Sequence, residues 1–244
     1  MSDNKIYGLI LVRAGSKRLP NKCFLDFGKI SMIEHIITRC KKFRITPIVC
    51  TSDKKENIKI IKIAKKTKTK YFVGSNHNKI KRMSDCVKKF KIKYFHTIDA
   101  DDPFFCGNQV KRSIKILLKG YDIVFPSKNS SLGGASVGFS INSDFLNKLN
   151  LKLKLNQKTE MMWKFFGLIK DRKTTTLPNQ DYDMRNTRLT LDYYEDYIFL
   201  CILRKHLGNF ASRKKIFLFL KKNKILKSIN FFRNKDWQRK QTIQ

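Results

Sequence analysis

The chain has 244 residues, of which 41% are hydrophobic and 12% aromatic, enough to bury a sizeable core and to exclude general disorder. No stretch approaches the roughly 20 consecutive apolar residues that a membrane-spanning helix needs. The formal net charge of +34 makes nucleic-acid binding one alternative to consider. Because the lysines are scattered over nearly every expected helix, we expect a solvated lysine coat and no specific recognition of nucleic acid.

The first residues of the chain and the spacing of its cysteines both favour the cytoplasm as its compartment. Residues 1–5 run directly into an apolar stretch without the basic segment and cleavage site of a secretory signal, so we expect a cytoplasmic protein that does not bind membranes. The six cysteines are widely spaced and have no zinc-ligand spacing. We therefore expect reduced, partly buried thiols.

Short apolar runs alternate with amphipathic stretches over the first two-thirds of the chain, which is the pattern of repeated β-α units. This alternation predicts an α/β fold with a mostly parallel, doubly wound sheet and helices on both faces. Strands are expected at 6–12, 45–50, 71–73, 94–98 and 122–125, and helices at 31–40, 58–64, 80–90 and 110–118.

The regular pattern breaks between about residues 127 and 186. This interval contains Gly133 and Gly134, an alternating segment at 135–141, and a polar stretch rich in Lys and Thr. We interpret it as a small lobe inserted over the edge of the sheet.

The β-α pattern then resumes with an expected strand at 187–191 and a helix at 194–206. A basic amphipathic helix at 216–220 and a frayed tail are expected to follow. We therefore divide the chain into one large domain at 1–212, which includes the lobe, and a basic C-terminal helix and tail at 213–244.

A basic turn follows the first expected strand. Arg13, Arg18 and Lys22 place three positive charges in one loop, and Gly15 lets backbone amides approach phosphate oxygens. The turn matches neither the P-loop pattern nor G-x-G-x-x-G. Because ligands bind at the carboxyl ends of strands in open α/β sheets, the turn predicts a triphosphate site. The alternative is an ordinary solvated loop.

Two distant acidic turns also follow apolar strands, one at 99–103 and the other at 192–196. Mg²⁺ is usually bound by one or two carboxylates together with substrate phosphates and water. We expect Asp101 and Asp192 to converge at the edge of the sheet, facing the basic turn, and to hold Mg²⁺. Acidic residues in such turns can instead cap the following helix, which is the role we favour for Glu195 and Asp196.

Taken together, these motifs resemble the cytidylyltransferase family that includes acylneuraminate and 3-deoxy-manno-octulosonate cytidylyltransferases, and within it the spore-coat polysaccharide biosynthesis branch. Residues 13–22 are similar to the family's A-R-x-G-S-x-R-L-P-x-K, and 188–196 to R-L-T-V-D-x-x-E-D. The markers follow in family order from residue 6 to 208. The remaining markers are Thr51-Ser52-Asp53, Gly74-Ser75, Arg82, and the turn ending in Asp101-Asp102-Pro103, which resembles G-D-C-P.

This chain also departs from the family pattern in three places. Asn21 stands where a glycine is common, and Ala100 and Asp102 replace the glycine and cysteine of the second motif.

The resemblance implies a Rossmann-like nucleotide-diphosphosugar transferase fold and a nucleotidyltransferase domain at 1–212. It implies Mg²⁺-dependent transfer of a cytidylyl group from CTP to an acidic sugar, with release of pyrophosphate, for surface polysaccharide or lipopolysaccharide biosynthesis. It also implies a homodimer formed partly through the inserted lobe. The implied catalytic residues are Arg18, Lys22, Asp101 and Asp192, with Mg²⁺ on the two aspartates. The implied nucleotide-binding residues are Leu11, Val12, Arg13, Ala14, Gly15, Ser16, Lys22, Thr51, Ser52, Asp53 and Arg82.

The sequence leaves two interpretations for the residues that would bind the acceptor. Glu160 and Lys164 either contact the acceptor or form an exposed pair one helical turn apart. The functional alternatives are transfer from another nucleoside triphosphate, transfer to a non-sugar acceptor such as a phosphonate, or a non-catalytic basic protein that binds nucleic acid.

Overall fold

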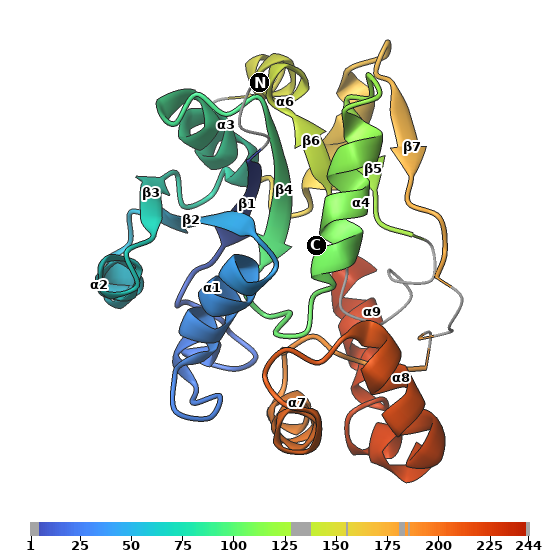
Figure 1. Ribbon diagram of the computed structural model, residues 1–244. Coiled ribbons are helices and arrows are strands. Elements are labelled where there is room, and N and C mark those ends of the chain that lie inside the picture. Colours follow the sequence, from blue (N-terminus) through green and yellow to red (C-terminus); the bar gives the residue numbers. More distant parts are fainter. Residues whose placement is uncertain (1–4, 128–137, 155, 181–183, 185, 243–244) are drawn as a thin grey trace.

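The computed structural model describes residues 5–127, 138–154, 156–180, 184 and 186–242. It contains a seven-stranded sheet in the order β3-β2-β1-β4-β6-β5-β7, with helices on both faces (Figure 1). All paired strands are parallel except β6, which runs antiparallel to both β4 and β5. The predicted α/β class with a mostly parallel, doubly wound sheet is therefore confirmed.

The elements agree closely with the predicted alternation up to residue 125. The strands are β1 (Ile6–Leu11), β2 (Ile45–Ser52), β3 (Lys70–Gly74), β4 (Tyr94–Asp99), β5 (Ile123–Phe125), β6 (Ser140–Asn142) and β7 (Thr174–Thr176). The helices are α1 (Met32–Lys42), α2 (Ile58–Lys66), α3 (Lys79–Lys89), α4 (Gly107–Leu117), α6 (Ser143–Leu151), α7 (Tyr194–Leu207), α8 (Arg213–Lys222) and α9 (Arg233–Thr242). Short 3₁₀ helices are η1 (Lys22–Phe24), η2 (Lys55–Asn57), η3 (Met162–Leu168) and η4 (Lys224–Ile229).

Two hydrophobic layers cover the sheet, because successive side chains of a strand point to opposite faces. In β1, Ile10 packs into the layer formed with α1, α2 and α4. Its neighbours Leu9 and Leu11 pack into the opposite layer, formed with α3 and α6. Burial on both faces explains why β1 is a continuous apolar run in the sequence.

The interval 127–186, predicted to be a lobe, also contributes to the sheet itself. β6 lies between β4 and β5, and α6 packs in the same layer as α3. The alternating segment predicted at 135–141 leads into β6, although residues 135–137, like Gly133 and Gly134, lie outside the described residues. The division of the chain into domain, lobe and tail stays a prediction.

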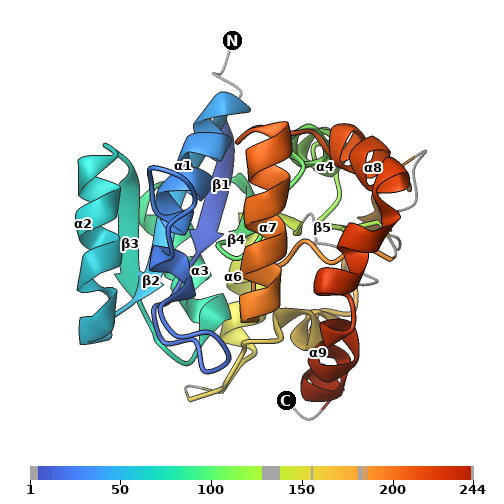
Figure 2. The same cartoon turned by 90° about the horizontal axis from the view of Figure 1, so that it is seen from below.

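The predicted strand at 187–191 does not form. Leu189 and Leu191 are buried in a third hydrophobic cluster with α7 and α8, below the carboxyl edge of the sheet. Figure 2 shows α7 between α1 and α8 in this region. The apolar residues at 187–191 therefore pack against helices, and one backbone bond, from Leu191 N to Asp101 O (2.8 Å), ties the segment to the acidic turn after β4.

The predicted frayed tail is also wrong. The basic helix is longer than expected, and η4 and α9 follow it. Asn230 and Asn234 are buried, and Asn230 Nδ2 donates to Arg188 O (3.0 Å). These polar contacts order the C-terminal segment, which hydrophobic periodicity alone does not reveal.

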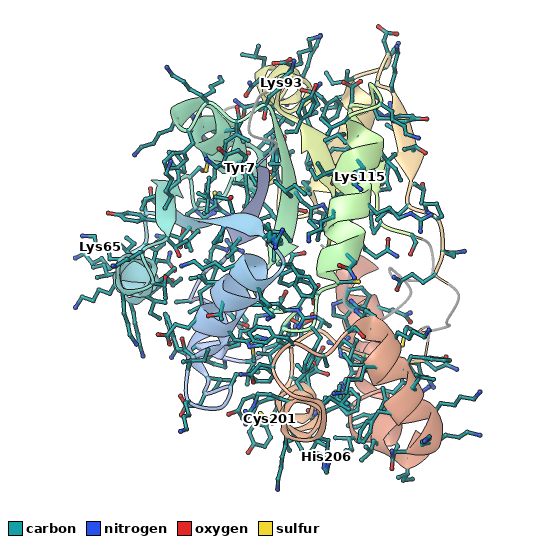
Figure 3. All side chains as sticks on the ribbon, viewed as in Figure 1. Tyr7, Lys65, Lys93, Lys115, Cys201 and His206 are labelled. Atoms are coloured by element: carbon teal, nitrogen blue, oxygen red, sulfur yellow. The ribbon has the colours of Figure 1, made fainter. Side chains whose placement is uncertain are left out.

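The surface carries lysines on many separate elements. Lys65 on α2, Lys93 before β4 and Lys115 on α4 are all exposed and lie on different parts of the molecule (Figure 3). No helix among the described residues is long and apolar enough to cross a membrane. All six cysteines are free thiols.

A fully buried arginine on α1 connects the segment just after the first acidic turn to the link before α8. Arg39 donates to three backbone carbonyls: Phe105 O (2.9 Å), Asn209 O (3.1 Å) and Ala211 O (2.9 Å). Burial lowers the pKa of Arg39 to about 10, and nearby Arg213 adds to this effect.

We predict that Arg39→Met lowers the free energy of unfolding by about 3 kcal/mol, because two buried carbonyls and the carbonyl of Asn209 lose their donor while most of the side-chain volume is kept. Urea denaturation measures this change. The matched control is Lys62→Met on α2, where the side chain is exposed, and it should change stability by less than about 0.5 kcal/mol. Equal stability of the two variants would contradict the structural role of Arg39.

Candidate functional site

The basic turn leaves the carboxyl end of β1 and is held in place by the end of β2. Ala14 N donates to Asn57 Oδ1 (2.9 Å), and Asn57 Nδ2 donates to Ser52 O (3.0 Å) and Ser52 Oγ (2.8 Å). Asn57 is 1% exposed. A buried amide with all of these bonds fixes the backbone of the turn, although the sequence analysis did not single out Asn57.

Asn21 marks the end of this turn and explains one departure from the family pattern. Its backbone has φ 56° and ψ 22°, in the left-handed region, immediately before η1. Glycine adopts this conformation without strain, and asparagine tolerates it better than most other residues. The turn geometry therefore fits a position at which glycine is common.

Lys22 brings the two predicted aspartates together. Its Nζ donates to Asp101 Oδ2 (2.7 Å), Asp192 Oδ1 (2.9 Å) and Leu191 O (2.8 Å). Arg18 Nη2 also donates to Asp192 Oδ1, at 2.6 Å. The expected convergence of the basic turn with both acidic turns is therefore present, with the two carboxylates bound to one ammonium group.

The charges in this cluster depend on one another. Burial would disfavour the charged form of Lys22, but Asp101 and Asp192 outweigh it and raise the pKa of the ammonium above its ordinary value. Burial would likewise raise the pKa of Asp192, whose side chain is 4% exposed, but Lys22 and Arg18 lower it to about 2. Both groups are therefore ionised at neutral pH.

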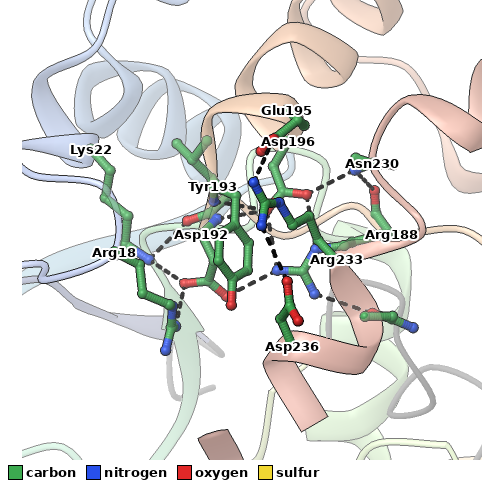
Figure 4. A network of polar contacts seen from close by, with 12 residues as sticks. Arg18, Lys22, Arg188, Asp192, Tyr193, Glu195, Asp196, Asn230, Arg233 and Asp236 are labelled. Atoms are coloured by element: carbon green, nitrogen blue, oxygen red, sulfur yellow. Dashed lines mark hydrogen bonds and ion pairs between the residues drawn. The ribbon is translucent and has the colours of Figure 1, made fainter. Parts of the chain in front are cut away.

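Behind Asp192 lies a buried polar network (Figure 4). Asp196 Oδ2 accepts bonds from the backbone N–H groups of Asp192 (2.9 Å) and Tyr193 (3.0 Å), so it caps the start of α7 as expected. Glu195 instead forms an ion pair with Arg233 of α9 (2.6 Å). Arg188 lies between Asp192 and Asp196 and bonds to both.

The cluster lies in a cleft of about 410 Å³ at the carboxyl edge of the sheet. Most of the predicted nucleotide-binding and catalytic residues line it, together with Glu160. Five further lining residues were not among the predicted site residues: Lys17, Cys23, Lys79, Asp99 and Ala100. The complete lining is Leu11, Val12, Arg13, Gly15, Ser16, Lys17, Arg18, Lys22, Cys23, Lys79, Arg82, Asp99, Ala100, Asp101, Glu160 and Asp192.

Some predicted site residues are elsewhere. Thr51 is fully buried in β2, Ser52 bonds to Asn57 beneath the basic turn, and Asp53 is exposed just beyond the strand. Ala14 is 4% exposed and contributes its backbone to the turn. Lys164 is exposed on η3 and does not line the cleft.

A second set of charges lies in the same cleft. Arg13 Nη2 donates to Glu160 Oε2 (2.8 Å), which is the partner that Glu160 has in place of Lys164. Lys79 Nζ lies 3.6 Å from Asp99 Oδ1. Arg82 is 2% exposed and donates to Ser75 O (2.7 Å). Sequence reasoning missed Lys79, which starts α3 without a distinctive motif, and gave no role to Asp99, although it begins the acidic turn after β4.

Asp101 and Asp192 are the residues of the cleft that could hold a divalent cation. One oxygen of each carboxylate lies within 3 Å of the same positive group, Lys22 Nζ. Among the described residues, no group of three or more His, Cys, Asp or Glu side chains could hold a metal. An ion at Asp101 and Asp192 would therefore complete its coordination with phosphate oxygens and water, which is how Mg²⁺ is commonly bound.

Comparisons with known proteins agree with this fold. An uncharacterized protein of Methanocaldococcus jannaschii is 30% identical over 234 residues, covering 93% of this chain and 94% of the relative. A cytidylyltransferase structure from Leptospira borgpetersenii has a TM-score of 0.80 at 24% identity, covering 91% of this chain and 96% of that chain. A CMP:2-keto-3-deoxy-manno-octonic acid synthetase complexed with CTP has a TM-score of 0.62 at 13% identity, with coverages of 83% and 99%.

These structures share the Rossmann-like α/β fold of this chain, and the family match that follows makes the chain a nucleotidyltransferase. Residues 7–226 match the model of the family described as cytidylyltransferase, and the chain belongs to that family. It is therefore an enzyme of the class that uses CTP. The more specific likeness to the spore-coat branch stays a prediction.

We predict that the ion pairs of Asp192 make stability depend on acidic pH. Because its pKa falls from about 3.9 in an unfolded chain to about 2 in the fold, this contribution is complete above about pH 4 and is lost as the pH falls toward 2. The stability difference between wild type and Asp192→Asn should therefore shrink by about 2 kcal/mol over this range.

Urea denaturation at pH 5, 4, 3 and 2.5 measures this difference. The control is Asp171→Asn, because Asp171 is exposed and its substitution should leave the pH dependence of wild type unchanged. A difference between wild type and Asp192→Asn that stays constant from pH 5 to 2.5 would contradict the lowered pKa of Asp192.

Proposed function

We propose that the protein transfers a cytidylyl group from CTP to an acidic sugar, with Mg²⁺ as cofactor, for the biosynthesis of a surface glycan. The observation that carries the proposal is the convergence of Arg18 and Lys22 with Asp101 and Asp192 in one cleft. These residues combine cations for a triphosphate with two carboxylates for a divalent cation.

The basic turn supports triphosphate binding. Arg18 and Lys22 present charged donors, and Arg18 retains a 25% exposed side chain. Gly15 and Ser16 line the cleft beside them, so that backbone N–H groups of the turn can also approach phosphate oxygens. We infer that these groups hold the triphosphate and orient its α-phosphorus toward the acceptor.

Asp101 and Asp192 would hold Mg²⁺. When bound, Mg²⁺ would offset the negative charge on the phosphate oxygens. Lys22 is bonded to both carboxylates in the structure and would exchange them for phosphate oxygens when the nucleotide enters. Its ammonium would then neutralise the charge that develops on the leaving pyrophosphate.

The reaction needs no protein nucleophile. An acceptor hydroxyl oxygen bonds to the α-phosphorus, and the bond from that phosphorus to the bridging oxygen of pyrophosphate breaks. Pyrophosphate leaves with the electron pair, and the hydroxyl proton passes to solvent. The protein contributes by positioning the reactants and stabilising charge, mainly through Arg18 and Lys22.

The second set of charges supports an acidic acceptor. Arg13, Lys79 and Arg82 line the part of the cleft next to Glu160. A carboxylate on the sugar would be attracted to these cations, while Glu160 could accept hydrogen bonds from sugar hydroxyls. We therefore propose an acceptor role for Glu160 but not for Lys164, which is exposed outside the cleft. A homodimer is proposed from the family resemblance alone.

We expect purified protein to release pyrophosphate from CTP with Mg²⁺ and an acidic sugar, tested with a panel of 2-keto-3-deoxy sugar acids. A neutral sugar, a phosphonate, and ATP, GTP or UTP in place of CTP test the alternatives in the same assay. Asp101→Asn and Asp192→Asn should each lower kcat/KM at least about 100-fold, because each removes a carboxylate from the proposed cation site.

The control variant Asp171→Asn lies outside the cleft and should keep kcat/KM within about twofold of wild type. Circular dichroism and thermal unfolding establish that all variants are folded. Full turnover in folded Asp101→Asn and Asp192→Asn would contradict the proposed cation site, and turnover with only another nucleotide would contradict the use of CTP.

A further inference from the structure

Arg188 is the centre of the buried network behind Asp192 (Figure 4). Its side chain is 0% exposed. Its Nε donates to Asp196 Oδ1 (2.8 Å), its Nη1 to Asn234 Oδ1 (3.1 Å), and its Nη2 to Asp192 Oδ2 (3.2 Å) and Asp196 Oδ2 (3.1 Å). All three nitrogens of the guanidinium therefore have partners, which fixes its plane and position.

The two oxygens of Asp192 have different partners. Oδ1 bonds to Arg18 and Lys22, which line the cleft. Oδ2 bonds to Arg188, on the buried side. Because a carboxylate is rigid and planar, the bond from Arg188 to Oδ2 sets the direction in which Oδ1 faces the cleft. Arg188 thus acts on the oxygen that would bind a cation without reaching the cleft itself.

The C-terminal segment completes the support of Arg188. Asn234, on α9, accepts from its Nη1, and Asn230, just before α9, donates to Asp196 Oδ1 (2.9 Å) and to Arg188 O (3.0 Å). Both asparagines are buried. They lie 38 and 42 residues after Asp192 in the chain, in a segment beyond the family match, which ends at residue 226.

We propose that Arg188, Asn230 and Asn234 are positioning residues for Asp192, so that the segment from Asn230 to Asn234 tunes the affinity of the cleft for its divalent cation. The proposal depends on the proposed cation site at Asp101 and Asp192. Partners that orient a metal-binding side chain typically change metal affinity 10- to 100-fold when they are removed. The hydrogen bonds of Asn234 and Asn230 give each of them such a role, through Arg188 and Asp196.

Binding of Mn²⁺ to the full-length protein tests this inference without relying on turnover. Free Mn²⁺ is measured by electron paramagnetic resonance while protein with a non-hydrolysable CTP analogue is titrated. We expect Asn234→Ala to raise the Kd for Mn²⁺ about 10-fold, because Arg188 Nη1 loses its acceptor and the guanidinium can turn away from Asp192. The Kd of the analogue at saturating Mn²⁺ should change less than twofold.

Asn223→Ala is the matched control. It removes one hydrogen bond of an asparagine in the same C-terminal region, from Nδ2 to Phe219 O (2.9 Å), and Asn223 is exposed. This variant should bind Mn²⁺ as wild type does. Asn230→Ala provides a second test if Asn234→Ala does not fold, and it should weaken Mn²⁺ binding in the same direction.

The outcomes separate this inference from the proposed function. A wild-type protein that binds no Mn²⁺ with the CTP analogue would overturn the cation site and the positioning role together. Wild-type binding with equal Mn²⁺ affinity in Asn234→Ala and Asn223→Ala would overturn the positioning role alone. Failure of both Asn234→Ala and Asn230→Ala to fold would assign these residues to stability and would also overturn it.

Discussion

The structure depends on one interaction, the contact of the Lys22 ammonium with the carboxylates of Asp101 and Asp192. Two carboxylates that face the same point repel each other unless a cation lies between them. In the structure Lys22 provides this cation and holds the basic turn against both acidic turns. The same contact lowers the pKa of Asp192 to about 2 and keeps both carboxylates facing the cleft that we propose as the cation site. We propose that, when a nucleotide binds with its metal, the metal binds the two carboxylates and Lys22 binds phosphate oxygens instead.

The topology of the sheet makes this contact between distant parts of the chain. β1 pairs in parallel with both β2 and β4, and Leu11 is in register with Asp99. The ladder extends one step beyond the strands, since Ala100 N donates to Leu11 O (3.3 Å) and Val12 N to Cys50 O (3.3 Å). The basic turn and the first acidic turn therefore leave the sheet side by side. The bond from Leu191 N to Asp101 O then brings Asp192 to the same place.

The sequence predicts the parts of this arrangement that depend on local pattern. The buried run at β1, its alternation with α1, and the charges of residues 13–22 are visible without a structure, and so is the preference of acidic turns for strand ends. The prediction of a strand at 187–191 was wrong because Leu189 and Leu191 are buried by packing against α7 and α8, not by a neighbouring strand. The roles of Asn57 and Asn234 could not be predicted, because each depends on hydrogen bonds to residues far away in the chain or hidden beneath a turn.

The central claim is that Lys22 occupies the position of a divalent cation and gives it up to the nucleotide. A crystal structure with Mn²⁺ and a non-hydrolysable CTP analogue, with Mn²⁺ located by its anomalous scattering, tests this claim most directly. The account predicts one Mn²⁺ bound by Asp101 and Asp192, with Lys22 Nζ bonded to phosphate oxygens. Mn²⁺ bound elsewhere, with Lys22 still joining the two aspartates, would contradict it.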